Sequence, residues 1–428
     1  IEQLRQRKQR LSIHKALPIA EKWMTKMRGI PGLQTLAAAG SLRRWKTTIG
    51  DLDFVGASNK PAEVMKSFLE LEGILQVISQ GEHKTSVLTE DGLNLQLWLQ
   101  PPERFGSLLQ FVTGSKAHNV RLREFALKQG LSLSERGFLD QNLKEILCPR
   151  EEDVYQKLGL AFIPAEMRED RGEIPLAAEK RLPDLVTLAD MRADLHIHTD
   201  WTDARSSMEE MVQYAIQSGL KVLAITDHSH ATIRVNGLDA SRWHEQAGAF
   251  QQLKKKYSQS ITLLHGIEAE ILEDGSLDIS DEVLAQMDIV LASLHEYLDQ
   301  PREVITSRLI KAIRNPQVDI IAHPSGRELP RTNGADLDWE QVYAAARENQ
   351  VALEINSNPV HFDLDEVHAR QAVEQGVLLC IDTDSHANHK MENLKFGVAI
   401  ARRAWLEKAN ILNTWPTEKL LEWIRNRR

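Results

Sequence analysis

The sequence of 428 residues has few cysteines, few aromatic residues and no long hydrophobic run. Its two cysteines, Cys148 and Cys380, are too few for a disulfide framework, so a reducing cytoplasm is the expected environment. No apolar segment approaches the roughly 20 residues of a membrane span, and the first ten residues lack the apolar core of a signal peptide. Aromatic residues, 6% of the chain, form no regular stacking platform for single-stranded nucleic acid. We therefore expect a cytoplasmic protein without a membrane partner.

The chain is long enough for two or three domains, and its charge is unevenly distributed between them. Residues 1–150 carry 22 Lys and Arg against 15 Asp and Glu, whereas residues 151–428 carry 30 against 46. The net charge of -9 conceals this division. A basic part joined to an acidic part suggests an arm that meets an anion and a body built around carboxylates, although uneven surface decoration explains the charges equally well.

The amino-terminal half predicts a mixture of helices and short strands. Residues 1–30 are expected to be helical, with Gly29 as the stop signal. After Gly40, short alternating runs indicate strands, with a hairpin at Asp91-Gly92, and a helical stretch follows that is interrupted at Gly114. Residues 150–190 are charged and contain three prolines, which is typical of a linker.

From Ala193 onward, apolar strand-like runs alternate with helix-like sequence. Polar residues at the ends of the runs fall at positions 196, 228, 268, 295, 323, 354 and 384, with intervals of 27 to 40 residues. That period is the size of successive βα units. Seven parallel, strongly apolar strands favour a βα barrel over a two-layer sheet, and the chemistry of such barrels lies at the carboxyl ends of the strands.

Histidines and carboxylates gather at those strand ends. His196 and His198 are two residues apart and so leave the same face of a strand, as do Asp384 and His386. Any one of the 15 histidines, taken alone, is best explained as a surface or hydrogen-bonded core residue. Together they predict a metal site, because imidazole suits Zn, Mn and Fe, and because so many donors fit two or three ions that share a carboxylate. The nine candidate ligands are His196, His198, Asp203, His228, Glu268, His295, His323, Asp384 and His386.

A second candidate site lies in the segment GSLRRWKTTIGDLDFV at residues 40–55. Gly40-Ser41 would allow the backbone to approach a phosphate group. Asp51 and Asp53 are two apart on a predicted strand, so both carboxylates face the same way and could hold Mg²⁺. A solvated strand face is the alternative explanation.

The second half resembles the PHP family of metallophosphoesterases through ADLHIHTDWTD, AITDHSH, AHPSGR and IDTDSHA. The resemblance implies a distorted seven-stranded barrel with three divalent metals, Mn²⁺ or Zn²⁺, with Fe as a further candidate. It implies one ion at His196, His198, Glu268 and Asp384, a second at Glu268, His295 and His323, and a third at Asp203, His228 and His386. Arg327 is predicted either to contact a phosphate oxygen in a catalytic role or to be an ordinary surface arginine.

The first half resembles the palm and thumb of bacterial family X DNA polymerases. The resemblance rests on the segment at 40–55, on PPERFGSLLQFVTGSKAHN at 101–119 and on LGLAFIPAEMREDRGEI. It implies an α/β multidomain chain with an α+β nucleotidyltransferase palm (1–108), a thumb (109–165), a linker (166–190) and a (β/α)7 PHP barrel (191–428). It further implies catalytic Asp51 and Asp53 holding Mg²⁺ or Mn²⁺, and nucleotide contacts from Gly40, Ser41, Arg44, Thr113, Gly114 and Ser115.

Three departures from the family pattern predict impaired polymerisation. Gln96 stands where the family has its third metal-binding aspartate, and Trp45 replaces the usual glycine after the arginine pair. The helical domains that precede the palm in this family are also missing, so we expect that a chain beginning at Ile1 is a fragment or has lost residues upstream. Losing one of three charged ligands commonly weakens metal binding and reduces the rate by orders of magnitude.

The favoured function is a metal-dependent DNA phosphoesterase in repair, a 3′–5′ exonuclease with 3′-phosphatase or abasic-site cleavage as variants. The expected partners are DNA ends, gaps or single strands, with dNTP as a candidate, and the expected state is a monomer. Three alternatives stay open. They are an active polymerase of base excision repair, a phosphatase of a small phosphomonoester such as histidinol phosphate, and a non-catalytic scaffold that binds DNA ends.

Overall fold

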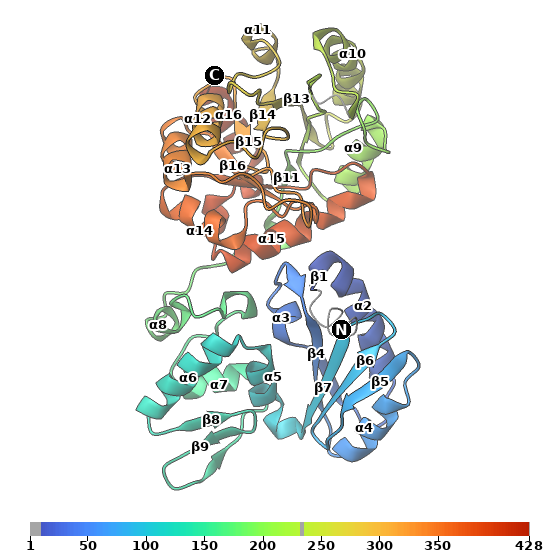
Figure 1. Ribbon diagram of the computed structural model, residues 1–428, viewed down its shortest axis with the longest axis vertical. Helices are drawn as coiled ribbons and strands as arrows, with labels where there is room; N and C mark the ends of the chain where they lie inside the picture. Colours follow the sequence, from blue (N-terminus) through green and yellow to red (C-terminus); the bar gives the residue numbers. More distant parts are fainter. Residues whose placement is uncertain (1–9, 232–234, 428) are drawn as a thin grey trace. The chain divides into compact units, whose positions relative to one another are not determined.

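The computed structural model describes residues 10–231 and 235–427 (Figure 1). The chain divides into two compact units, Ile1–Leu182 and Pro183–Arg428. The division falls inside the segment 166–190, which the sequence predicts to be a linker. Within the described ranges, no helix combines the length and the apolar character that crossing a membrane requires.

The predicted palm, in the first unit, contains a five-stranded sheet with the order β2-β4-β7-β6-β5. Strands β4 and β7 are parallel, and the other neighbours are antiparallel. On β4 the side chains of Leu52 and Phe54 are fully buried, and the alternation of the strand places Asp51 and Asp53 on the opposite face. Helix α5 packs against this sheet, and Leu108 forms an apolar cluster with Val55. The elements over the predicted palm are β1 (Leu11–Ser12), α2 (Ile13–Arg28), β2 (Thr35–Ala38), α3 (Gly40–Arg43), β3 (Thr48–Ile49), β4 (Asp51–Ala57), α4 (Pro61–Leu69), β5 (Ile74–Ser79), β6 (Lys84–Thr89), β7 (Asn94–Gln100) and η1 (Pro102–Arg104). Helix α5 (Phe105–Thr113) crosses the predicted boundary between palm and thumb at residues 108 and 109.

The prediction of helix over residues 1–30 is confirmed for α2, which ends at Gly29. It is wrong for Leu11 and Ser12, because these residues pair with Ile49 and Thr48 as a short antiparallel strand. The part of that prediction that falls on residues 1–9 lies outside the described residues.

The thumb joins two helices to a small antiparallel sheet with the order β10-β9-β8. A buried ion-pair network connects it to the palm. Glu151 at the start of α7 accepts from Arg168 Nη1 at 2.5 Å and from Arg43 Nη2 at 2.6 Å, and both Glu151 and Arg168 are buried. The remaining elements of this unit are α6 (Lys116–Lys128), β8 (Ser132–Ser134), β9 (Gly137–Leu139), β10 (Glu145–Ile146), α7 (Glu151–Lys157), η2 (Ala165–Met167) and α8 (Glu173–Ala178).

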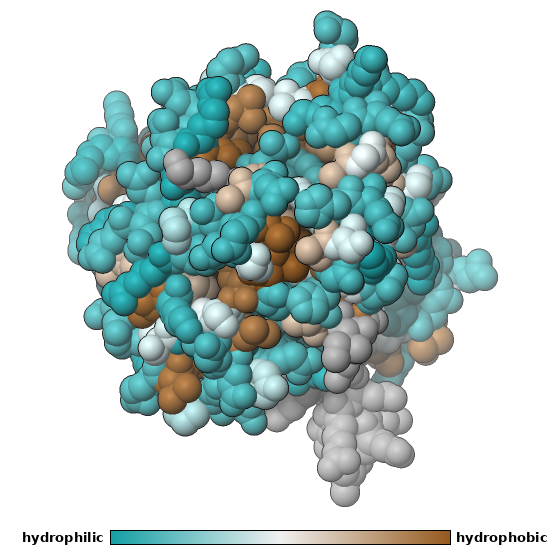
Figure 2. Space-filling model, turned by 90° about the horizontal axis from the view of Figure 1, so that it is seen from above, coloured by the Kyte–Doolittle hydropathy of each residue, from teal (hydrophilic) through white to brown (hydrophobic). Residues whose placement is uncertain are grey.

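The second unit is a parallel sheet of seven strands in sequential order, β11 to β17, which confirms the predicted succession of βα units. The residues of β12, β14, β15, β16 and β17 are all buried, as expected for strands covered on both faces. Helices surround the sheet (Figure 1), and hydrophilic side chains predominate on the face seen in Figure 2, with apolar ones in separate patches. The elements are η3 (Leu188–Asp190), β11 (Ala193–Asp194), α9 (Met208–Gln217), β12 (Val222–Ile225), α10 (Ala240–Lys256), β13 (Thr262–Glu270), α11 (Asp281–Leu284), β14 (Ile289–Ser293), α12 (Arg302–Ile313), β15 (Ile320–Ile321), α13 (Trp339–Glu348), β16 (Ala352–Asn356), α14 (Glu366–Glu374), β17 (Leu379–Asp382), η5 (Asn388–Asn393), α15 (Leu394–Arg403), η6 (Lys408–Asn410), η7 (Leu412–Thr414) and α16 (Thr417–Asn426).

The first and last strands meet at a seam that nearly closes the barrel. Just beyond β11 and β17, Ile197 and Ser385 form an isolated parallel bridge, and Asp384 donates its backbone N–H to the carbonyl of His196 at 2.9 Å. Below this bridge the amide of Asn413 spans the gap, because its Nδ2 reaches the Ala193 carbonyl at 3.1 Å and the Ile381 carbonyl at 2.9 Å. The seam is therefore held by a few specific contacts and not by a long ladder.

Candidate metal centre and palm site

All nine predicted ligands of the barrel come together at the carboxyl ends of its strands. His196 and His198 follow β11, His228 follows β12, and Glu268 lies within β13. The other five follow in the loops after β11, β14, β15 and β17. Four groups of donors in this region are close enough to hold an ion, and each group draws on several strands. The sequence pattern thus identified the residues that the barrel assembles.

Glu268 lies at the centre of the cluster and is only 1% exposed. Its Oε1 is 2.9 Å from His323 Nε2 and 3.6 Å from His295 Nε2. Its Oε2 is 2.8 Å from His228 Nδ1 and 3.4 Å from His196 Nε2. Because its two oxygens face different histidines, this carboxylate has the geometry of a bridge between ions.

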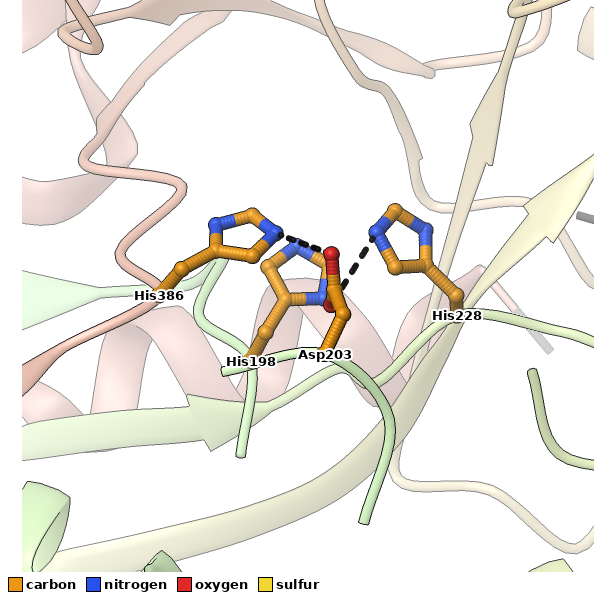
Figure 3. Close-up of side chains that lie close together, drawn as sticks. All are labelled: His198, Asp203, His228 and His386. Atoms are coloured by element: carbon orange, nitrogen blue, oxygen red, sulfur yellow. Dashed lines mark ion pairs between the residues drawn. The ribbon is translucent and has the colours of Figure 1, made fainter. Parts of the chain in front are cut away.

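Asp203 organises a second group, with His198, His228 and His386, which Figure 3 shows. His386 Nε2 lies 3.3 Å from one carboxylate oxygen of Asp203, and His228 Nε2 lies 3.8 Å from the other. The ring of His198 stacks on the rings of both His228 and His386, with centroids 4.2 Å apart in each case. These four residues point toward one another, and among the donor groups of the described residues theirs is the most exposed.

Asp384 connects the groups from the last strand. Its Oδ1 lies 3.0 Å from His198 Nε2 and 3.8 Å from His196 Nε2. The two Nε2 atoms of His196 and His198 are themselves only 3.1 Å apart. Such close approach of imidazole nitrogens to one another and to a carboxylate is typical of a shared coordination sphere.

Several buried donor atoms of the cluster support the fit to metal ions. Within the described residues, His198 Nδ1, His228 Nδ1, His323 Nδ1 and Glu268 Oε2 have no hydrogen-bond partner. His228 Nδ1 and Glu268 Oε2 are 2.8 Å apart, yet they lack hydrogen-bond alignment. Buried polar atoms without partners are unfavourable, and a divalent cation would compensate them.

A second layer of carboxylates orients the histidines. His196 Nδ1 lies 2.8 Å from Glu354 Oε1, and His295 Nδ1 lies 2.6 Å from Glu270 Oε2. With Nδ1 held in this way, Nε2 of each ring is free to face the cluster. Sequence reasoning did not assign Glu354 and Glu270 to the site, although Glu354 falls on the strand-end period.

The charged and titratable groups of the cluster strongly shift one another's pKa values. Burial alone would raise the pKa of Glu268, but the histidines around it hold that pKa well below its ordinary value. Burial lowers the pKa of His323 and His386, but Glu268 outweighs it at His323 and Asp203 at His386, so that each pKa rises to about 9. Burial and the neighbouring imidazoles lower the pKa of His198 to about 3.

In the structure, the side chain of Arg327 makes a hydrogen bond to another loop of the barrel. Its Nε donates to the carbonyl of His361 at 2.7 Å, and Nδ1 of His361 lies 2.7 Å from the Arg327 carbonyl. His361 lines a cavity of about 1040 Å³ together with His323 and Asp384, and Arg327 is not among the described residues that line it. Sequence reasoning missed His361 because it follows β16 in a loop, away from the period of the other donors.

The palm site brings Asp51, Asp53 and Gln96 together on adjacent parallel strands. Gln96 is the register partner of Asp53, and its Nε2 donates to Asp51 Oδ2 at 3.1 Å. Burial, and then the charge of Asp51, raises the pKa of Asp53 to about 7. Gly40 has φ +58°, and a Cβ atom there would lie 2.2 Å from Asp53 Oδ2, so the close approach of this loop to the carboxylate requires glycine.

The predicted nucleotide-binding residues also lie near one another. Arg44 Nη1 donates to the Thr113 carbonyl at the end of α5, beside Gly114, and Arg44 Nε donates to Glu169 at 3.1 Å. Ser115 caps α6 by accepting from the N–H of His118 at 3.2 Å. The hydroxyl oxygen of Ser41 is buried and makes no hydrogen bond within the described part of the chain.

Trp45 adopts φ +52°, the left-handed region in which glycine is favoured. The tryptophan therefore occupies a position whose backbone suits the glycine that is usual in the family. A residue with a side chain pays about 1–2 kcal/mol in this conformation.

A seven-stranded βα barrel with this rim of donors defines the second unit as a PHP-class domain. Residues 194–358 match the family model of the PHP domain, and residues 108–169 match the model of the DNA polymerase beta thumb.

The chain is 39% identical over 408 residues to the DNA polymerase/3′–5′ exonuclease PolX of Bacillus subtilis, an alignment that covers 95% of this chain and 71% of that protein. It is 29% identical over 246 residues to a probable phosphatase of Thermoanaerobacter sp. strain X514, covering 55% of this chain and 95% of that protein. It is 33% identical over 247 residues to a probable phosphatase of Shewanella sediminis, covering 55% of this chain and 94% of that protein. The chain therefore belongs to the family X DNA polymerases that carry a PHP domain, and this domain makes it an enzyme of the phosphoesterase type.

Proposed function

We propose that the protein is a metal-dependent DNA phosphoesterase, a 3′–5′ exonuclease that acts in DNA repair and whose palm polymerises poorly. The observation that carries the proposal is the convergence of nine donors from six strand ends and the first βα loop on one buried cluster around Glu268. A structural metal site usually closes with four ligands, so a larger, partly open cluster supports catalysis.

The residues at the barrel rim would form three ion sites. His196, His198, Glu268 and Asp384 would hold one ion, Glu268 with His295 and His323 a second, and Asp203 with His228 and His386 a third. When bound, such ions supply an activated nucleophile and neutralise charge on phosphate oxygens. Glu354 and Glu270 keep His196 and His295 in the orientation that binding requires.

The palm residues support the proposal of weak polymerase activity, because the third position that is acidic in the family carries an amide. Gln96 donates a hydrogen bond to Asp51, and so it occupies an oxygen that would otherwise face a metal ion. Two further contacts support a residual nucleotide site, because Gly40 lies close to Asp53 and Arg44 donates to the Thr113 carbonyl. We propose that Asp51 and Asp53 bind Mg²⁺ or Mn²⁺ weakly, and that Arg44 contacts the phosphates of dNTP.

DNA is the proposed substrate because the polymerase part accompanies the barrel. The relative from Bacillus subtilis is named a polymerase and 3′–5′ exonuclease, whereas the shorter relatives are named probable phosphatases. The excess of basic residues over residues 1–150 supports binding to a polyanion. A small phosphomonoester is the second candidate substrate, and the likeness to those phosphatases favours it.

The test offers the protein, loaded with Mn²⁺, a labelled primer–template with and without dNTP. We expect the primer to shorten in both conditions, with little extension. Asp384→Ala should abolish shortening, while Asp53→Ala should leave it unchanged and remove any residual extension. Extension that outpaces shortening would contradict the impaired palm. Hydrolysis of p-nitrophenyl phosphate without shortening of DNA would favour the small-molecule phosphatase.

A further inference from the structure

His361 lies beside the predicted metal centre and belongs to none of its predicted ligand sets. It follows β16, its side chain lines the cavity of the centre, and its ring stacks on that of His323 with centroids 4.7 Å apart and an angle of 15°. With Asp384 these two histidines form one of the four donor groups that are close enough to hold an ion. A role for His361 at this centre rests on the proposed metal-dependent function.

The orientation of the His361 ring leaves one nitrogen for the cluster. Its Nδ1 is 2.7 Å from the Arg327 carbonyl, which can only accept a hydrogen bond, so Nδ1 carries the proton and Nε2 carries the lone pair. The Arg327 side chain returns the contact by donating to the His361 carbonyl at 2.7 Å. A backbone carbonyl that fixes the tautomer is the usual support of a metal-binding histidine.

The loop that carries His361 is held in place from a second side. Asp363 accepts from the backbone N–H and the hydroxyl of Ser325, at 2.8 and 2.7 Å. The loops after β15 and β16 are thus joined at Ser325–Asp363 and at Arg327–His361. These contacts lie outside the cluster and help to hold the His361 ring in its orientation toward the cluster.

The spacing of the donors fits coordination better than a hydrogen bond. His361 Nε2 is 3.6 Å from Asp384 Oδ2, too long for a hydrogen bond. Two donors that each lie about 2.1 Å from one ion, at angles of 110–120°, are about 3.4–3.6 Å apart. Asp384 presents Oδ1 to His198 at 3.0 Å and Oδ2 to His361, so its two oxygens face different sides of the cluster. His323 belongs to the same donor group, and its Nε2 lies 2.9 Å from Glu268 Oε1.

We propose that His361 is an additional metal ligand, which binds through Nε2 the ion held by His323 and makes Asp384 a bridging carboxylate. This assigns a fourth protein side chain to an ion for which Glu268, His295 and His323 are otherwise the only predicted ligands. Arg327 then acts as a positioning residue for His361.

The test compares His361→Asn with the full-length wild type. The asparagine amide can still donate to the Arg327 carbonyl, but it removes the donor at Nε2. Metal-stripped proteins are titrated with Mn²⁺ by calorimetry, and the bound metal is counted by elemental analysis. We expect at least a tenfold loss of affinity in one class of site, with the other classes unchanged. The control, His244→Ala, removes an exposed histidine of α10 and should titrate like the wild type.

Unchanged Mn²⁺ affinity and stoichiometry in His361→Asn would overturn the assignment of His361 alone. A wild type that binds no Mn²⁺ would overturn it together with the proposed function. A measurement on the wild type avoids any folding defect of the variant: Mn²⁺ should protect His361, but not His244, from diethyl pyrocarbonate, as read by mass spectrometry. Full modification of His361 in the Mn²⁺-loaded protein would also refute the proposal.

Discussion

Replacing Gln96 with aspartate would restore a third carboxylate to the palm. In the structure the Gln96 amide donates to Asp51 at 3.1 Å and lies in register with Asp53. The substitution exchanges this neutral donor for a negative charge. Gln96→Asn is the matched control, because it has the size of the aspartate variant without its charge.

The magnitude follows from the separation of the charges. A carboxylate at position 96 would lie about 5 Å from that of Asp51, and two unit charges at this distance repel by about 3 kcal/mol at an effective dielectric constant of 20. Asp53 already has a pKa raised to about 7 by burial and by Asp51. Without metal at pH 8, we therefore expect Gln96→Asp to lower the free energy of unfolding of the first unit by about 3 kcal/mol.

The loss of stability expected for Gln96→Asp depends on metal and on pH. Saturating Mg²⁺ should remove the penalty, because three carboxylates around a divalent ion attract it more strongly than two. At pH 5 the penalty should shrink, because below a pKa of about 7 Asp53 is protonated and no longer repels its neighbours. Urea unfolding at both pH values, with and without Mg²⁺, measures the effect of metal and the effect of pH on the free energy of unfolding.

Primer extension supplies the functional readout. We expect Gln96→Asp to extend a primer about 100-fold faster than Gln96→Asn at saturating Mg²⁺, a factor typical of one charged group at a catalytic centre. Equal extension by the two variants, together with equal Mg²⁺ stabilisation, would refute the idea that the missing charge limits the palm.

Two further predictions concern the metal centre and the joint between palm and thumb. The pKa values of His323 and His386 are about 9, and the two residues belong to different proposed ion sites. Each of these sites should therefore release about one proton when Mn²⁺ binds at pH 7, and the affinity of each should rise up to about 10-fold per pH unit until about pH 9. Calorimetry in two buffers of different ionisation enthalpy tests this, and a flat profile would contradict it. The same raised pKa values stabilise the metal-free barrel fully below pH 6.5, and this contribution is lost as the pH rises through 9. Glu151→Ala should lower the free energy of unfolding by about 3 kcal/mol in urea, because it leaves Arg168 buried without its carboxylate. Arg150→Ala, which breaks an exposed pair, should leave it nearly unchanged.

Much of the barrel was predictable because its period and its polar residues coincide. Seven apolar runs, each ending in a polar residue, require one topology, and in that topology the ends must meet. The spacing therefore predicted that His196, Glu268 and Asp384 share one site. The same logic located Asp51 and Asp53, because alternation on a strand places them on one face.

The rest depends on contacts between loops, which leave no period in the sequence. His361 reaches the cluster only because Arg327 and Asp363 tie two loops together, and neither pairing could be inferred from spacing. Glu151 and Arg168 fall in a charged stretch that resembles a solvated surface, yet they are buried because they neutralise each other. Leu11 and Ser12 form a strand because Ile49 and Thr48 offer an unpaired edge, which overrides their local helical preference.

The position of the metal centre at the seam of the barrel has a consequence for the stability of the fold. His196 and His198 stand on one side of the seam, and Asp384 and His386 stand on the other. The backbones there are joined by a few contacts, among them the Ile197–Ser385 bridge and the hydrogen bond from Asp384 N–H to the His196 carbonyl. Any ion bound by residues from both sides would link the first strand to the last. At an ion concentration 100-fold above its dissociation constant, this link would raise the free energy of unfolding of the second unit by about 2.7 kcal/mol. Removing the ions with a chelator would then open the barrel at its seam first. The metal ions of the proposed reaction would therefore also stabilise the fold.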